Sequence, residues 1–407
     1  MSTTTGQTSA TAVATTAVNW RERHQQIREW KRQKKADKQR KLLAKTGAVV
    51  DDDGAADTTN GVTTNDATTD TTAAASASES MDITTTGAET STTTTDSGRQ
   101  WTASIAVPFS IVENAQSAEL KAYLIGQIAR SLVVFNIDEI VVFDEYCSQQ
   151  PPITDSTDNS LQYDKRRSAM VQMIRILQYL ECPQYLRKYL FPLQKDLQYA
   201  GLCNPLDSTH HLKTADTDCR YREGVVTNKP AQEGRGSHVY IGLQRDVQID
   251  RSLRPNVRVT VRLADNCDLR RSKRLKGVAV SPDEPRELAG LYWGYQIRVA
   301  KSLSAVFGES PYAGGYDLTI GTSDRGDNVD KHLRQLPKRF NHLLVVFGGL
   351  KGIEAAHDSD ESLSSVEDTR DLFDHYLNTC PNQGSNTIRT EEAILITLSA
   401  LRKRLLR

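Results

Sequence analysis

Residues 378–401 read NTCPNQGSNTIRTEEAILITLSAL, a polar turn followed by an amphipathic segment. The PNQG stretch at 381–384 favours tight or left-handed backbone and predicts a loop. We expect a helix to begin near Thr390 as its N-cap, with Glu391 and Glu392 in the first turn, where the helix dipole favours carboxylates. Its predicted buried stripe consists of Ile394, Leu395, Leu398, Leu401 and Leu405. Such a loop exposes backbone N–H groups that suit a small polar ligand, although an ordinary turn that binds nothing has the same pattern.

Two further glycine-bearing loops, at 321–326 and 348–352, also follow short hydrophobic strands. In an open α/β sheet, ligands bind beyond the carboxyl ends of the strands, so the three loops together predict one site. The sequence contains neither GxGxxG nor GxxxxGK followed by Ser or Thr. A Rossmann dinucleotide site and a P-loop nucleotide site are therefore disfavoured.

Five stretches resemble the SPOUT-class methyltransferases, in the branch of the human SPOUT-domain protein and its archaeal relatives with an inserted OB domain. They are SIAVP (104–108), EIVVFD (139–144), LTIGTSDRG (318–326), VFGGLKGIE (346–354) and the segment from Asn378. They occur in the family's order and span most of residues 100–407. The resemblance implies an α/β, Rossmann-like domain with a trefoil knot. It also implies a bent S-adenosylmethionine cofactor, a pocket completed at a homodimer interface, and an RNA substrate.

The same resemblance implies that the three loops hold the cofactor. The expected contacts are Gly321, Thr322, Ser323, Gly348, Gly349, Gly352, Asn382, Gln383, Gly384, Ser385, Thr387 and Ile388. The chain departs from the expected pattern at Asn382, where glycine is more usual. Since Asn is the best substitute for glycine in left-handed backbone, we expect binding to survive this departure.

The implied reaction transfers the cofactor's methyl group to a base nitrogen of ribosomal RNA, and uridine N3 is the first atom to test. Arg389 is the first candidate for orienting the base or stabilising its developing negative charge, and Arg325 is the second. Glu391 or Glu392 would be the base, unless both serve only as N-terminal helix charges. The alternative function is a non-catalytic RNA-binding protein that acts as a ribosome-assembly factor or scaffold with the same fold.

Charge is segregated along the chain although its formal net charge is zero. Residues 1–99 are predicted to be disordered, and within them residues 21–45 carry eleven Lys or Arg against three Asp or Glu. This basic segment, 20–45, predicts nuclear and possibly nucleolar localisation or an RNA-contacting arm; a solubilising segment is the alternative. Residues 46–100 carry ten Asp or Glu against Arg99 alone and predict a disordered linker.

The folded part divides into an α/β domain, 100–205 and 293–407, and a small inserted β-domain, 206–292. Alternation of apolar and polar residues at 256–263 supports the β-domain, whereas its OB-like form is implied only by the resemblance. A helix is expected over 117–134, with Leu120, Leu124, Ile128 and Leu132 on its buried face. Residues 357–371 are acidic and predict an exposed excursion.

The inserted domain carries a dense basic stretch that predicts phosphate contacts with RNA, with a merely solubilising surface as the alternative. Its members are Arg251, Arg254, Arg258, Arg262, Arg270, Arg271, Lys273, Arg274 and Lys276. The six cysteines have no metal-ligand or disulfide spacing, so we predict no metal and reduced thiols. No apolar run is long enough for a transmembrane helix, and no signal peptide is evident.

Overall fold

The computed structural model describes residues 98–147, 157–230, 235–264, 269, 272 and 274–406, with only the backbone at 157–165. The basic segment 20–45 and the acidic linker therefore lie outside the described residues. So do three of the predicted RNA contacts, namely Arg270, Arg271 and Lys273.

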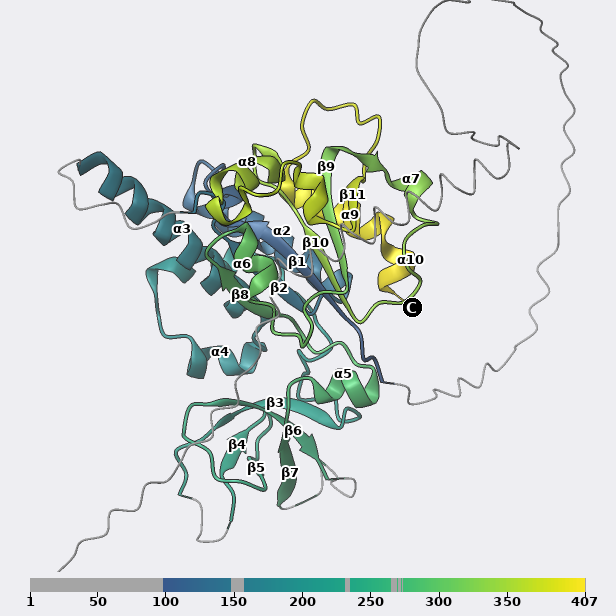
Figure 1. Cartoon of the computed structure of the whole chain (residues 1–407). Helices are drawn as coiled ribbons and strands as arrows, with labels where there is room; N and C mark the ends of the chain where they lie inside the picture. Colours follow the sequence, from purple (N-terminus) through teal and green to yellow (C-terminus); the bar gives the residue numbers. More distant parts are fainter. Residues whose placement is uncertain are drawn as a thin grey trace, which may run out of the picture. The chain divides into compact units, whose positions relative to one another are not determined.

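A six-stranded sheet, with all its neighbouring strands parallel, forms the centre of the α/β domain (Figure 1). Its strand order is β11-β9-β10-β1-β2-β8. The strands are β1 (Thr102–Pro108), β2 (Glu139–Phe143), β8 (Gln296–Ala300), β9 (Leu318–Asn328), β10 (His342–Val346) and β11 (His375–Asn378). β1 and β2 are buried along their whole length, as expected for predominantly apolar strands in a sheet covered on both faces.

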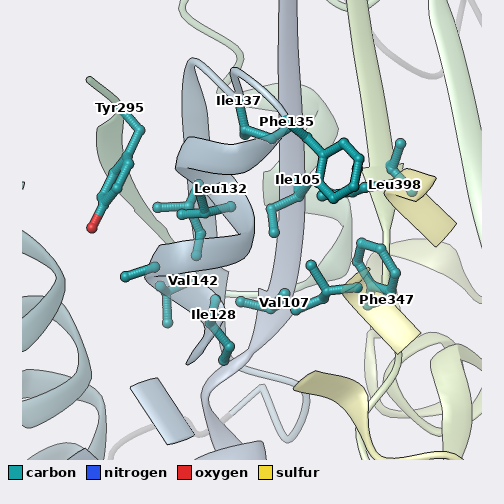
Figure 2. Close-up of a cluster of buried hydrophobic side chains, with 14 of the residues drawn as sticks. Ile105, Val107, Ile128, Leu132, Phe135, Ile137, Val142, Tyr295, Phe347 and Leu398 are labelled. Carbon is teal, nitrogen blue, oxygen red and sulfur yellow. The ribbon is translucent and has the colours of Figure 1, made fainter. Parts of the chain in front are cut away.

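Helices cover both faces of this sheet. The α-helices of the domain are α2 (Ala118–Val134), α3 (Thr157–Glu181), α4 (Gln184–Leu190), α6 (Leu303–Gly308), α7 (Val329–His332), α8 (Gly352–Ser359), α9 (Thr390–Ala400) and α10 (Arg402–Leu405). Short 3-10 turns are η1 (Phe109–Val112), η2 (Lys195–Leu197), η3 (Ala200–Leu202), η4 (Glu361–Leu363) and η5 (Thr369–Leu372). Figure 2 shows one core, in which Ile128 and Leu132 of α2 pack with Ile105 and Val107 of β1. A second core, which includes Val306 of α6 and Ile353 of α8, covers the other face.

The inserted segment forms a closed five-stranded barrel in the order β3-β4-β5-β7-β6 (Figure 1). Its strands are β3 (Tyr221–Val226), β4 (His238–Tyr240), β5 (Val247–Gln248), β6 (Arg258–Leu263) and β7 (Leu275–Val280), and α5 (Glu284–Ala289) follows. Closure leaves no free sheet edge, and a core of Val, Ile and Leu fills the interior. The barrel strands lie within the predicted insertion, but β7 was not anticipated because it begins inside the basic stretch, with Lys276 as its second residue.

Three local expectations were wrong. Leu120 and Leu395, predicted to be buried, are 54% and 48% exposed, whereas the other members of both stripes are buried. The N-cap of α9 is Arg389 rather than Thr390. The acidic stretch at 357–371 is not wholly exposed, since Leu363 lies in the second core and Asp360 accepts a hydrogen bond from the backbone N–H of Ser304 (2.8 Å).

Candidate cofactor and RNA site

The order of the strands brings the three loops together. β9 lies between β11 and β10, so their carboxyl ends, and the loops that follow, adjoin at one edge of the sheet. These loops line a cavity of about 340 Å³, hereafter the loop pocket. Its volume is within the range of about 300–1,000 Å³ that small-molecule sites occupy.

Eight of the twelve predicted cofactor residues line this pocket. They are Thr322, Ser323, Gly348, Gly349, Gly352, Gln383, Thr387 and Ile388. The other four, Gly321, Asn382, Gly384 and Ser385, do not line it. Asn382 has φ 60°, so it adopts the left-handed backbone expected of it.

Two positions of the pocket must be glycine for a structural reason that the sequence did not reveal. A Cβ at Gly348 would overlap the backbone of Gly352 and lie 2.5 Å from Ile353 N. Gly352 itself has φ +81°, which side chains rarely adopt. These glycines therefore hold the loop in a tight turn at the start of α8, in addition to any approach to a ligand.

A carboxylate that was not predicted as a site residue, Glu354, lies in the pocket wall. Its Oε1 accepts hydrogen bonds from the hydroxyls of Ser323 (3.1 Å) and Tyr376 (2.9 Å). Burial is the main cause that raises the pKa of Tyr376, so this phenol stays protonated and donates to Glu354. The match VFGGLKGIE ends on this residue, and that was the available signal.

The pocket is tied to the neighbouring elements by side-chain hydrogen bonds. The hydroxyl of Thr322 donates to the carbonyl of Val346 (2.9 Å), which joins β9 to β10. The hydroxyl of Thr390 donates to the carbonyl of Gly348 (3.0 Å), which joins the start of α9 to the glycine loop. Thr390 therefore supports the pocket instead of capping its own helix.

The predicted catalytic residues are divided between two places. Arg325 is exposed and lines the loop pocket, whereas Arg389 and Glu391 do not line it. Arg389 pairs with Glu391 (3.6 Å), and its backbone N–H donates to Glu392 (3.0 Å). Glu391 and Glu392 instead line a second cavity, of about 300 Å³, between α2 and α9. Within one chain, neither Arg389 nor Glu391 thus forms part of the loop pocket.

Two predicted RNA contacts pair with carboxylates that are distant in the sequence. Arg258 pairs with Glu181 (2.5 Å) and Glu223 (2.6 Å), and Arg262 pairs with Glu284 (2.7 Å). Sequence spacing could not reveal this, because Glu181 lies in α3, 77 residues before Arg258. By contrast, Arg251, Arg254, Arg274 and Lys276 are exposed, and among the described residues Arg251 pairs only with the adjacent Asp250 (3.3 Å).

Within the described ranges, no group of three or more His, Cys, Asp and Glu side chains is arranged to hold a metal ion. None of the helices described here has the length and apolarity needed to cross a membrane.

Comparison with known proteins identifies the family. Residues 102–401 match the family described as "Putative RNA methyltransferase". The chain is 54% identical to the mouse "28S rRNA (uridine-N(3))-methyltransferase", with 75% of this chain and 77% of that protein covered. The human protein of the same name is 53% identical, with coverage of 75% and 79%. The Drosophila melanogaster protein of that name is 52% identical over 75% of this chain, which spans 62% of its length. The chain therefore belongs to this family of RNA methyltransferases.

Proposed function

We propose that this protein uses S-adenosylmethionine to methylate N3 of a uridine in the RNA of the large ribosomal subunit. The observation that carries the proposal is the identity of 52–54% with three proteins named for that activity. The matched region contains the whole loop pocket and the whole barrel.

The loop pocket suits the cofactor's mixed chemistry. Glycine-lined backbone at 348–349 allows close approach of a flat adenine ring, and the carboxylate of Glu354 is placed to accept from a hydroxyl or an ammonium group. The aromatic and aliphatic lining from Phe347, Ile388 and Ile396 supplies the apolar part. When bound, the cofactor would supply an electrophilic methyl group on a sulfonium.

We assign the fold to the knotted SPOUT class with an OB-type insertion. The parallel sheet with order β11-β9-β10-β1-β2-β8, and ligand loops after its β9, β10 and β11, supports the first assignment. The closed five-stranded barrel supports the second.

We further propose that two copies associate through α2 and α9. Exposed apolar side chains gather on these helices, namely Leu120, Tyr123, Val134 and Leu395, and a second copy would remove them from water. The cavity between the two helices carries Glu391, so association would bring Arg389 and Glu391 to the interface, near the partner's pocket. This accounts for the position of these residues outside their own chain's pocket.

The barrel is the proposed RNA grip, through the exposed cations Arg251, Arg254, Arg274 and Lys276. The basic segment 20–45 is proposed to direct the protein to the nucleus. Replacing its Lys and Arg by Gln should disperse a fluorescent fusion into the cytoplasm, and continued nuclear concentration would contradict this proposal.

The decisive experiment is mass spectrometry of ribosomal RNA from cells with and without the gene. We expect 3-methyluridine to disappear from one position and to return with the wild-type protein. If every 3-methyluridine persists at full level after deletion, the proposed substrate is wrong.

A further inference from the structure

Two buried oxygen atoms beside the loop pocket have no hydrogen-bond partner among the described residues. They are Oε2 of Glu145, in the turn after β2, and Oγ of Ser110, in η1 after β1. Glu145 is 7% exposed and Ser110 is 5% exposed. An unpaired buried polar atom costs about 1–3 kcal/mol, so two together point to a ligand that would satisfy them.

Both atoms adjoin the glycine loop. β1 pairs with β10 on one side and with β2 on the other, so their carboxyl ends meet at the edge where the loop pocket lies. A Cβ added to Gly349 would overlap Glu145 Oε2 and lie 2.9 Å from Ser110 Oγ. Gly349, which lines the pocket, is therefore in direct contact with these two polar groups.

A stacking surface stands next to the two oxygens. Tyr146 is 36% exposed, its ring meets Phe109 edge-on (centroids 6.2 Å apart), and the guanidinium of Arg166 lies 4.1 Å from its centroid. Proteins hold unstacked bases on aromatic rings and arginine planes and read them by hydrogen bonds to the base edge. The exposed ring of Tyr146 could stack on a base in this way, and the two neighbouring oxygens could form the hydrogen bonds to its edge.

The surroundings also shift the pKa of the Glu145 carboxyl. Burial raises the pKa of its carboxyl above the usual value, and the nearby carboxylates of Asp144 and Glu113 act in the same direction. The neighbouring hydroxyls of Ser110 and Tyr146 act against this shift without cancelling it, although Ser110 Oγ and Glu145 Oε2 make no hydrogen bond of ordinary geometry. A carboxylate with a raised pKa takes up a proton more readily at neutral pH.

We propose that Glu145 is the catalytic base for the target uracil, with Ser110 donating to a uracil carbonyl beside N3 and Tyr146 stacking on the ring. This rests on the proposed function. The Glu145 carboxylate accepts the N3 proton while N3 bonds to the methyl carbon and the carbon–sulfur bond of the cofactor breaks. The sulfonium becomes a neutral thioether, and the proton leaves Glu145 to solvent after product release.

The first test measures binding without the reaction. It uses the full chain and an RNA oligonucleotide that carries the uridine mapped by mass spectrometry, in unmodified form or as 3-methyluridine. Loss of the N3–H hydrogen bond should weaken wild-type binding of the methylated RNA about tenfold. In Glu145→Ala this difference should fall towards one. An undiminished difference would overturn the proposal.

The second test measures methyl transfer. Glu145→Gln should lower the rate about 100-fold or more, with affinity for S-adenosylhomocysteine unchanged. The loss should shrink on RNA with 5-fluorouridine at the target, because its N3–H is more acidic and needs less help from a base. Glu309→Gln is the control, because Glu309 is an exposed carboxyl outside this cluster and should leave the rate within about twofold.

Two outcomes separate this proposal from the function on which it rests. If the wild-type protein methylates no ribosomal RNA, the proposed function fails. If the wild type is active and folded Glu145→Gln retains its rate, only the assignment of Glu145 fails. Should the amide variant melt early, Glu145→Asp replaces it: the shorter acid should keep part of the rate, and a rate no higher than that of Glu145→Ala would count against a base.

Discussion

In the structure Arg258 stabilises the fold, although it was predicted to contact RNA. Its guanidinium joins the barrel strand β6 to Glu181 at the end of α3 and to Glu223 on β3. Burial alone would raise the pKa of Glu181, but Arg258 and His210 outweigh it and hold that pKa well below its usual range. Glu223 is further bound by Thr260 and Trp293 (2.6 Å each). This cluster is a buried, paired network at the junction of barrel and α/β domain.

Removing Arg258 should therefore destabilise the protein strongly. Arg258→Ala leaves two buried carboxylates without their cation, and we expect a loss of about 3 kcal/mol in the free energy of unfolding. Denaturant unfolding checks this value. The exposed Arg254→Ala is the matched control and should change stability by no more than about 0.5 kcal/mol. Equal effects of both substitutions would contradict the structural role of Arg258.

His211 gives the fold a pH dependence. Burial is the main cause that lowers its pKa from 6.5 to about 4, and its Nε2 lies 2.7 Å from the carbonyl of Glu181. Between pH 6.5 and 4 the unfolded state therefore binds more protons than the folded state. The contribution of His211 to the stability of the fold is full above pH 6.5 and falls as the pH drops towards 4. We expect a loss on the order of 2–3 kcal/mol over this window. Unfolding at pH 7.5 and pH 5 should show a smaller difference in His211→Gln than in wild type.

The glycines of the loop pocket differ in how much they tolerate. Gly348→Ala should weaken binding of S-adenosylhomocysteine at least tenfold, because its Cβ would overlap backbone that cannot move aside. At Gly384 a Cβ would meet nothing within 4 Å, so Gly384→Ala should bind within about twofold of wild type. Isothermal calorimetry distinguishes the two. A tight-binding Gly348→Ala would show that this turn does not shape the pocket.

The helices α2 and α9 show what apolar periodicity cannot decide. The pattern predicted both helices and most of their buried residues, but it counted Leu120 and Leu395 among them. An apolar side chain at helical spacing satisfies the pattern equally well whether it faces its own core or a partner. That the three loops form one site was predictable, because each follows a strand of the same sheet.

The contact of Glu145 with Gly349 was not predictable from the sequence, because it joins two loops that are 204 positions apart.

Association through these helices is testable with one residue. Leu395→Arg places a charge on the proposed interface without touching the core, since Leu395 is 48% exposed. Analytical ultracentrifugation should show a dimer for wild type and a monomer for the variant. Leu288→Arg, at a residue of α5 that is 55% exposed, should remain dimeric. A wild type that is monomeric at all concentrations would refute the dimer.

At the scale of the whole molecule, the exposed positive charges of the barrel should determine the affinity for RNA. Each phosphate contact contributes about 0.7 to the slope of log affinity against log salt for single-stranded RNA. Arg254→Ala and Lys276→Ala together should reduce that slope by about 1.4 and weaken binding of all sequences alike. Filter binding across salt concentrations provides the measurement. An unchanged slope would move the RNA contacts away from the barrel.

The pairing of β1 with β10 has a consequence for synthesis of the chain. Thr102 pairs with His342, 240 residues later, whereas every barrel strand pairs within residues 221–280. At about 5–20 residues per second, a ribosome needs on the order of 10–50 s to deliver β10 after β1. Once residue 280 has been made, the barrel has all its own pairing partners, while β1, which is buried on both faces in the finished sheet, still has one edge uncovered. The nascent chain is therefore a half-finished sheet attached to a finished barrel, and chaperones would meet it in that form.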